Sequence, residues 1–170
     1  MNKPLYRSVL LLMTLAVLLT AAPCTAAGMK IWVTLDDPPA PPSTGEAFAT
    51  ALRVSAWNGT VGALDVSVRF DPKKLSFQGF AENTDSRFSG NCYVDASRLK
   101  KGQMRIICYT TLQENEADAV TVGTLQWQAS GEAGSVTDIT LTVNGAVSAA
   151  WDAVDSETYG IQVTVADGET

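Results

Sequence analysis

Histidine is absent from the 170 residues, and this absence limits the chemistry that the chain could perform. It removes the most common general base, the most common zinc ligand and every nucleophile that a histidine must activate. Paired carboxylates can hydrolyse glycosidic bonds, yet no motif sets one pair of the 18 acidic residues apart. We therefore expect a protein that binds and does not catalyse, with no catalytic residue, no metal ligand set and no cofactor.

Two of the three cysteines have a spacing that suits a disulfide across a hairpin. If residues 91–96 and 103–111 pair so that Cys92 faces Cys108, then Val94 faces Ile106 and Ala96 faces Met104. One side of the hairpin then becomes wholly apolar. Directly opposed cysteines are oxidised in an exported protein, so we expect a Cys92–Cys108 disulfide; two buried free thiols are the alternative.

The other side of this hairpin would carry mixed side chains. In the same register Asp95 faces Arg105, Tyr93 faces Ile107, and Asn91 faces Tyr109. These are favourable cross-strand pairs.

The N-terminal residues have the features of a secretory signal peptide. Lys3 and Arg7 precede an apolar run over residues 9–19, and the small residues 25–27 follow. We expect cleavage after Ala27, which leaves one secreted domain over residues 28–170; a lipoprotein anchored through Cys24 is the alternative. The apolar run is too short to span a membrane.

Removal of this segment would change the formal net charge from −6 to −8, because it takes away Lys3 and Arg7 and no acidic residue. A surface with this charge repels nucleic acid, so we expect no nucleic-acid partner. The two acidic clusters have neither the ligand alternation nor the glycine of a calcium loop, so we interpret them as solvated loop charge. They are Glu114, Glu116 and Asp118, and Asp152, Asp155 and Glu157.

Strands separated by turns account for the rest of the chain. Alternating or apolar runs predict nine strands and no helix, which is typical of an all-β sandwich. The expected strands cover residues 30–35, 47–57, 62–70, 75–80, 91–96, 103–111, 119–129, 136–143 and 159–165. The alternation changes parity near Gly123, which predicts a β-bulge there.

The third of these strands shows the clearest pattern. Leu64, Val66, Val68 and Phe70 would point to the core, whereas Asp65, Ser67 and Arg69 would point outward. Asp71-Pro72 ends the strand, because proline cannot donate to a ladder. Leu75 is then expected to fold back as a buried plug.

These motifs resemble the cohesin domain and its relatives in the carbohydrate-binding-domain superfamily. The resemblance rests on Gly45-Glu46 before an alternating strand, GALDVSVRFDPKKL, the hairpin, VGTLQW, and Gly160 before IQVTV. Its most specific part is FDPKKL, which matches the family's aromatic-Asp-Pro-x-x-Leu. The resemblance implies an exported, non-catalytic jelly-roll sandwich of nine strands. In cohesins of polysaccharide-degrading complexes the protein partner is a dockerin, a small calcium-binding helical module.

The outward residues of the expected sheet would form the partner-binding face. In such cohesins an Asn-x-Asp on the strand before the Asp-Pro turn binds the dockerin; here the matching residues are Ala63-Leu64-Asp65, so the aspartate is present and the asparagine is not. The expected face consists of Asp65, Ser67, Arg69, Tyr93, Asp95, Arg105, Ile107 and Tyr109.

Exposed tryptophans suggest an alternative, because sugar rings stack on coplanar aromatic side chains. Trp127 shares the parity of Leu125 and Ala129, which predicts core packing. Trp57 and Trp151 are the candidates for binding a polysaccharide, although both could instead pack under a loop. The sequence Asn58-Gly59-Thr60 is a glycosylation sequon only if the source is eukaryotic.

Overall fold

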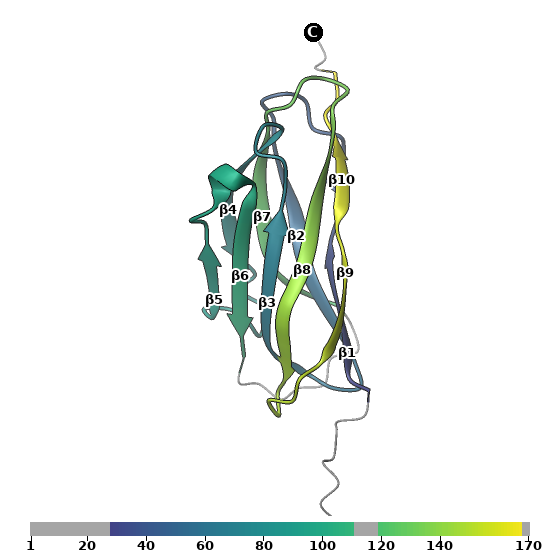
Figure 1. The fold of residues 1–170 in the computed structure, drawn as a ribbon, viewed down its shortest axis with the longest axis vertical. Helices are drawn as coiled ribbons and strands as arrows, with labels where there is room; N and C mark the ends of the chain where they lie inside the picture. The colour runs from purple at the N-terminus through teal and green to yellow at the C-terminus, as the bar shows by residue number, and fades with distance from the viewer. Residues whose placement is uncertain (1–27, 111–118, 168–170) are drawn as a thin grey trace, which may run out of the picture.

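The computed structural model describes residues 28–110 and 119–167, which form two five-stranded sheets packed face to face (Figure 1). One sheet, the β2 sheet, has the order β4-β7-β2-β1-β9, and the other, the β3 sheet, has the order β10-β8-β3-β6-β5. The strands are β1 (Lys30–Leu35), β2 (Ala47–Trp57), β3 (Val61–Arg69), β4 (Leu75–Glu82), β5 (Cys92–Asp95), β6 (Gln103–Tyr109), β7 (Val120–Ala129), β8 (Val136–Ser148), β9 (Asp155–Tyr159) and β10 (Ile161–Thr164).

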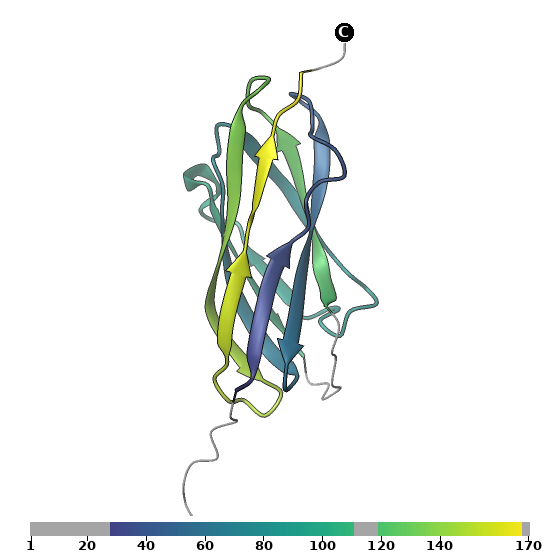
Figure 2. The same cartoon turned by 90° about the vertical axis from the view of Figure 1, so that its right-hand side faces the viewer.

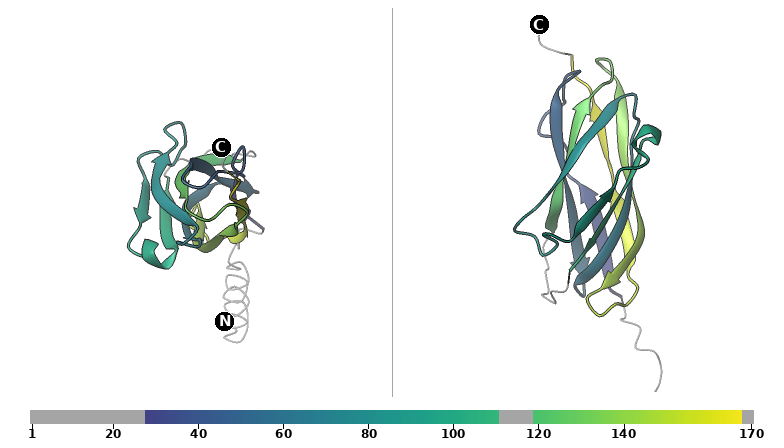
Figure 3. Two further views of the ribbon diagram at one scale, coloured as in Figure 1. Left: turned by 90° about the horizontal axis from the view of Figure 1, so that it is seen from above. Right: turned by 90° about the vertical axis from the view of Figure 1, so that its left-hand side faces the viewer.

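The predicted fold class is confirmed: the described residues form a jelly-roll β-sandwich, and the view from above in Figure 3 shows its two layers. The only helical element in these ranges is the short 3₁₀ turn η1 (Leu99–Lys101) before β6. No helix among the described residues is long and apolar enough to cross a membrane. The expected signal peptide, Cys24 and the acidic residues Glu114, Glu116 and Asp118 lie outside the described residues.

The strand expected at residues 159–165 corresponds to β10; its first residue, Tyr159, is instead the last residue of β9, a strand of the other sheet that was not expected. β9 pairs in parallel with β1, and β10 pairs with β8, so the chain changes sheet at Gly160 (Figure 2). A Cβ atom at Gly160 would lie 2.2 Å from the carbonyl oxygen of Ile139, so only glycine fits this crossing. β9 was not expected, because its acidic residues Asp155 and Glu157 were interpreted as loop charge; for this reason nine strands were expected and ten are found.

β9 also corrects the interpretation of the second acidic cluster. Asp155 and Glu157 lie in a strand, and Glu157 forms an ion pair with Lys30 at 2.5 Å. Glu157 also accepts a hydrogen bond from Trp32 Nε1 at 3.0 Å. Glu157 therefore ties β9 to β1, whereas Asp152 is exposed in the preceding loop.

The bulge expected near Gly123 is confirmed. Leu52 pairs with Gly123 and Arg53 pairs with Thr121, so Val122 is the extra residue in β7. A second bulge, which was not predicted, lies in β8: Asp65 pairs with Gly145 and Val66 with Val143, which leaves Asn144 unpaired in the ladder.

The core lies between the sheets and follows the predicted parity. Leu64, Val66, Val68 and Phe70 are buried. Trp127 is fully buried as predicted, and its ring contacts Phe70 edge-on at 5.0 Å between centroids. Its indole Nε1 donates to Thr50 Oγ1 at 3.0 Å, which satisfies the polar atom that burial would otherwise leave unpaired.

Leu75 is fully buried in this core, as predicted. Its backbone N–H donates to the Asp71 carbonyl at 2.9 Å, and the Asp71 carboxylate accepts from the Lys73 N–H at 2.9 Å. The Asp-Pro turn therefore reverses the chain and places Leu75 between the sheets.

The predicted hairpin and its disulfide are both present. Cys92 pairs with Cys108 across β5 and β6, with 4.2 Å between their Cα atoms and a bond between their sulfurs. The hairpin turns through η1 and Gly102, whose φ of 65° is the left-handed conformation that glycine tolerates. The expected pair of Ala96 with Met104 is not formed, because β5 ends at Asp95, where its carboxylate accepts from the Ser97 N–H at 2.9 Å.

Candidate functional site

The outer face of the β3 sheet brings the predicted site residues together. Across β5, β6 and β3, Tyr93 is paired with Ile107 and Ile107 with Asp65. The next row is Asp95, Arg105 and Ser67, and Arg69 follows opposite Gln103. Tyr109 lies opposite Ala63 at the other end of the face. All eight expected residues therefore lie on one continuous surface, which we call the β3 face.

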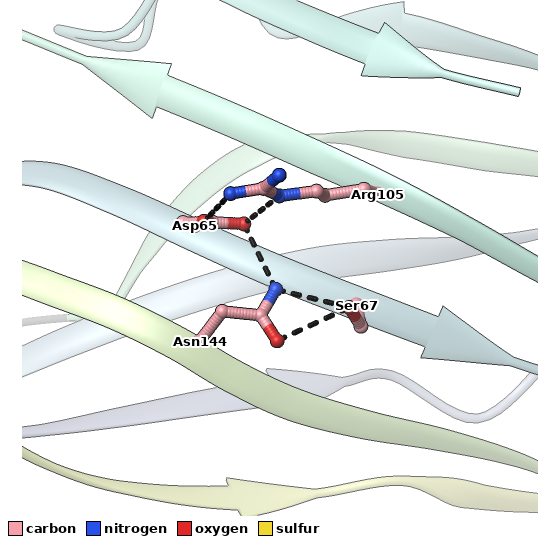
Figure 4. A network of polar contacts seen from close by, with 4 residues as sticks. All are labelled: Asp65, Ser67, Arg105 and Asn144. Carbon is pink, nitrogen blue, oxygen red and sulfur yellow. Dashed lines mark hydrogen bonds and ion pairs between the residues drawn. The ribbon is translucent and has the colours of Figure 1, made fainter.

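A polar network fixes the centre of this face (Figure 4). Arg105 donates two hydrogen bonds to the Asp65 carboxylate, from Nε at 2.7 Å and from Nη2. The Asn144 side-chain amide donates to the same carboxylate at 2.9 Å and to Ser67 Oγ at 2.9 Å. Ser67 consequently lies on the outer side of the sheet, as predicted, but is only 9% exposed.

Asn144 is the member of this network that sequence reasoning missed. The expected strand ended at Val143, one residue before it. The bulge in β8 turns the Asn144 side chain over Asp65 and Ser67, and bulges commonly re-aim a side chain in this way. The available signal was the Asn144-Gly145 pair between Val143 and Ala146, and an Asn-Gly pair is equally typical of a turn.

Hydrogen bonding changes the ionisation of the central pair. The bonds from the Arg105 guanidinium lower the pKa of the Asp65 carboxyl below its ordinary value of 3.8, and the Asn144 amide acts in the same direction. The same pairing raises the pKa of Arg105. The network is therefore charged at neutral pH, with the aspartate held in its ionised form.

Acid is expected to weaken this network. A carboxyl whose pKa is lowered by folding contributes stability above its unfolded pKa and loses that contribution as the pH falls through its folded pKa. Between about pH 5 and about pH 2, the wild type should therefore lose more free energy of unfolding than Asp65→Asn does. Urea unfolding of both proteins across this range measures the difference. Parallel curves would show that Asp65 contributes nothing to the acid response.

Apolar side chains cover the β5–β6 part of the face, next to the network. Tyr93 is 64% exposed and Tyr109 is 50% exposed. Ile107, which is paired with Tyr93, is half-buried. Each tyrosine directly follows a cysteine of the disulfide. The covalent bond thus fixes the backbone that presents both rings.

A hollow of about 420 Å³ lies on the β3 face beside the network. Seven of its eight lining residues are polar or charged, and the eighth, Met104, is a core residue. The lining residues are Ser67, Asp95, Ser97, Arg98, Gln103, Met104, Arg105 and Asn144. The face can therefore receive a polar side chain at the Gln103–Arg105 end of β6, while Tyr109 lies at the other end of that strand.

The two candidate sugar-binding tryptophans are exposed but are not among the strand residues that form the β3 face. Trp57 ends β2 and is 60% exposed, and Trp151 lies between β8 and β9 and is 71% exposed. Trp57 pairs with Lys30, the first residue of β1. Trp151 lies in the loop before β9, and the first residue of β9, Asp155, is also paired with Lys30, so both tryptophans are at the end of the molecule where β1 begins (Figure 1). Neither packs in the core, which corrects the alternative of packing under a loop.

Comparison with known proteins identifies the fold. No family model and no curated protein sequence matches the chain. Among solved structures, the sixth cohesin of scaffoldin B from Acetivibrio cellulolyticus, in complex with a Cel5 dockerin, is similar with a TM-score of 0.66 and 12% identity, covering 82% of this chain and 99% of that one.

Two further structures show the same similarity. A type I cohesin–dockerin complex from Clostridium thermocellum gives a TM-score of 0.64 at 11% identity, covering 83% of this chain and 95% of that one. A non-cellulosomal cohesin from the archaeon Archaeoglobus fulgidus gives 0.64 at 8% identity, covering 80% and 91%. In its fold, the chain is a cohesin-like domain.

Proposed function

We propose that this protein is an exported, non-catalytic module that docks a protein partner through the β3 face. The observation that carries the proposal is the pairing of exposed tyrosines with a fixed polar network on an otherwise solvent-facing sheet. An apolar centre beside oriented charged and amide groups is typical of protein interfaces, in which tyrosine and arginine dominate the binding energy.

The structural neighbours support a protein partner. Two of the similar cohesins were solved in complex with dockerins, so a dockerin-like module is the first partner to test. The resemblance to cohesins implied an Asn-x-Asp at residues 63–65, in which the asparagine is replaced by Ala63. In this chain the amide of Asn144 lies beside Asp65 and comes from the neighbouring strand. We infer that Asn144 and Asp65 together present the polar groups of the interface.

Export is part of the same proposal. A disulfide between Cys92 and Cys108 is stable in an oxidising compartment, which agrees with the signal peptide expected at residues 1–27. Mass spectrometry of the mature protein distinguishes cleavage after Ala27 from lipid attachment at Cys24.

Tyr109→Ala is expected to weaken docking by about 2 kcal/mol, or roughly thirtyfold in Kd, because the exposed ring would be buried in the complex. The mature domain is immobilised, partners are captured from proteins secreted by the same cells, and Kd is measured for each captured protein. Tyr159→Ala is the matched control, since Tyr159 is 55% exposed but lies on β9 of the other sheet.

The same measurement tests the polysaccharide alternative. Trp57→Ala and Trp151→Ala should leave docking unchanged, because neither side chain lies on the β3 face. If these two variants lose binding while Tyr109→Ala and Asp65→Ala retain it, the docking face is wrong and the tryptophans form the site.

A further inference from the structure

We propose that the partner docked on the β3 face presents carboxylate side chains to one corner of that face, formed by Arg69, Lys73, Arg98, Lys100 and Lys101. We call these five residues the basic corner. The inference builds on the proposed docking function, because it assigns the chemistry of the partner at one edge of the same face. It is carried by the way in which the cations of this chain are distributed and paired.

Most lysines and arginines elsewhere in the described residues already have partners. Lys30 is paired with Glu157, Arg53 with Asp36 at 2.7 Å, and Arg105 with Asp65. Lys74 donates to the carbonyl of Val136 at 2.7 Å, and the Arg87 guanidinium lies over the Phe88 ring at 5.6 Å.

The five cations of the basic corner differ from all of these. Within residues 28–110 and 119–167, they form no ion pair and no side-chain hydrogen bond, and each is exposed. Hydrogen bonds from Ser97, and then the charge of Arg98, lower the pKa of Asp95, but a partner could engage all five side chains without breaking an ion pair or a side-chain hydrogen bond. An ion pair formed with a partner would therefore be a net gain in Coulomb energy.

The fold brings these residues together from two segments. Arg69 ends β3 opposite Gln103, and the Phe70 N–H donates to the Gly102 carbonyl at 2.9 Å. Gly102 also lies against Pro72, so the turn after β3 touches the turn before β6. η1 carries Lys100 and Lys101 at this point, and it is the helical turn at the upper left of Figure 1.

The corner is positive on a molecule that is otherwise strongly acidic. Two carboxylates, Asp71 and Asp95, lie in the same segments, so five unpaired cations face two negative charges. Each of these carboxylates accepts a backbone N–H bond, from Lys73 and from Ser97. The chain as a whole has a net charge of −6. A field of reversed sign confined to one corner favours, and orients, a partner that is acidic at that point.

The hollow extends the corner toward the centre of the face. Arg98 lines it from one side and Arg105 from the other, and Ser97 and Asn144 add polar groups. Guanidinium groups suit the planar oxygens of a carboxylate. Because the exposed rings of Tyr93 and Tyr109 lie on the same face, the arrangement favours an acidic protein segment with an apolar anchor over a carboxylated glycan.

The test uses two carboxylate probes and the mature domain labelled with ¹⁵N. A hexaglutamate peptide is titrated at low salt, and chemical shifts are followed, including the Nε signals of Arg69, Arg98 and Arg105. A hexalysine peptide and a galacturonate hexamer are titrated in parallel. We expect hexaglutamate to shift signals of the basic corner and of Gln103. The shifts should disappear at 0.5 M NaCl, because the Debye length is then only about 4 Å.

Matched variants separate the corner from net charge. Arg98→Gln and Gln126→Glu each lower the net charge by one, but Gln126 is exposed on β7 of the other sheet. Arg98→Gln should weaken hexaglutamate binding by about two- to fivefold, the range for one exposed ion pair, while Gln126→Glu should leave it within error. Equal effects of the two variants, or no shifts at the corner, would overturn the inference.

Three further outcomes separate failure of the acidic-partner inference from failure of the proposed docking function. Shifts produced by the galacturonate hexamer without any from hexaglutamate would overturn the assignment to a protein segment. If Tyr109→Ala loses a captured protein whose Kd is unchanged by Arg98→Gln and by salt, the docking function stands and the acidic partner is wrong. If hexaglutamate binds at the corner but Tyr109→Ala changes no protein binding, the corner stands and the docking face fails.

Discussion

Leu75→Ala is expected to lower the free energy of unfolding by about 2–5 kcal/mol, the range for removing a large aliphatic side chain from a closed core. Leu75 is fully buried and belongs to the core cluster between the two sheets. The substitution removes apolar contacts and leaves a cavity. The Asp71 turn holds the backbone in place, so the surrounding chain cannot simply collapse into the space. Urea denaturation of the mature domain measures the loss.

Lys73→Ala is the matched control for this substitution. Lys73 is exposed in the same turn, so its replacement should change the free energy of unfolding by no more than about 0.5 kcal/mol. Lys74→Ala should also cost little, although Lys74 donates one hydrogen bond to Val136. An effect of Leu75→Ala smaller than that of either lysine substitution would mean that the Asp-Pro turn does not place a plug in the core.

Loss of the Cys92–Cys108 disulfide is expected to cost about 2–4 kcal/mol of unfolding free energy. The cysteines are 16 residues apart in sequence, and a bond that closes a loop of about this length restricts the unfolded chain by roughly 3 kcal/mol in the chain-entropy model. The double variant Cys92→Ala/Cys108→Ala, compared with the wild type in urea, measures this cost. Mass spectrometry of the unreduced, alkylated wild type checks the bond itself, since two alkylated thiols in freshly exported protein would contradict it.

The disulfide should matter locally as well as globally. β5 is an edge strand of four residues that pairs only with β6 among the described strands. Tyr93 lies in a hydrogen-bonded pair with Ile107, since the neighbouring pair Cys92–Cys108 is the close, non-hydrogen-bonded kind. Without the covalent bond, the amide proton of Tyr93 should exchange faster with solvent, while that of Val66 in the central strand β3 should keep its protection. Equal protection of Tyr93 in the double variant and in the wild type would show that strand pairing alone holds β5.

Much of the fold was predictable because its signals are local. The alternation of apolar and polar residues from Leu64 to Phe70 indicates a half-buried strand. The pairing of Cys92 with Cys108 followed from the requirement that one side of the hairpin be apolar. The bulge near Gly123 was visible as a change of parity within a single strand. These features depend on neighbours in sequence or on one pairing.

Features that depend on distant contacts could not be predicted in the same way. β9 carries acidic and polar side chains that gave no strand pattern, and the change of sheet after it places Gly160 against the carbonyl of Ile139, which lies 21 residues earlier in the chain. Asn144 joins the network because a bulge in β8 turns it toward β3, and the sequence did not indicate this bulge, since an Asn-Gly pair is equally typical of a turn. Most of the candidate face was therefore predictable from the sequence, whereas the residue that completes its central network was not.

The crossing at Gly160 has a mechanical consequence. The described chain enters at the start of β1 and leaves beyond β10 at the opposite end of the long axis (Figure 1). Tension applied between these two points would draw β1 one way and β9, through β10, the other way, so their parallel pairing from Lys30 to Thr34 would be loaded in shear. The hydrogen bonds of that pair, together with the Lys30–Glu157 ion pair, would then have to fail together and not one after another. A module anchored at one end and pulled through the other would resist stretching in its native state.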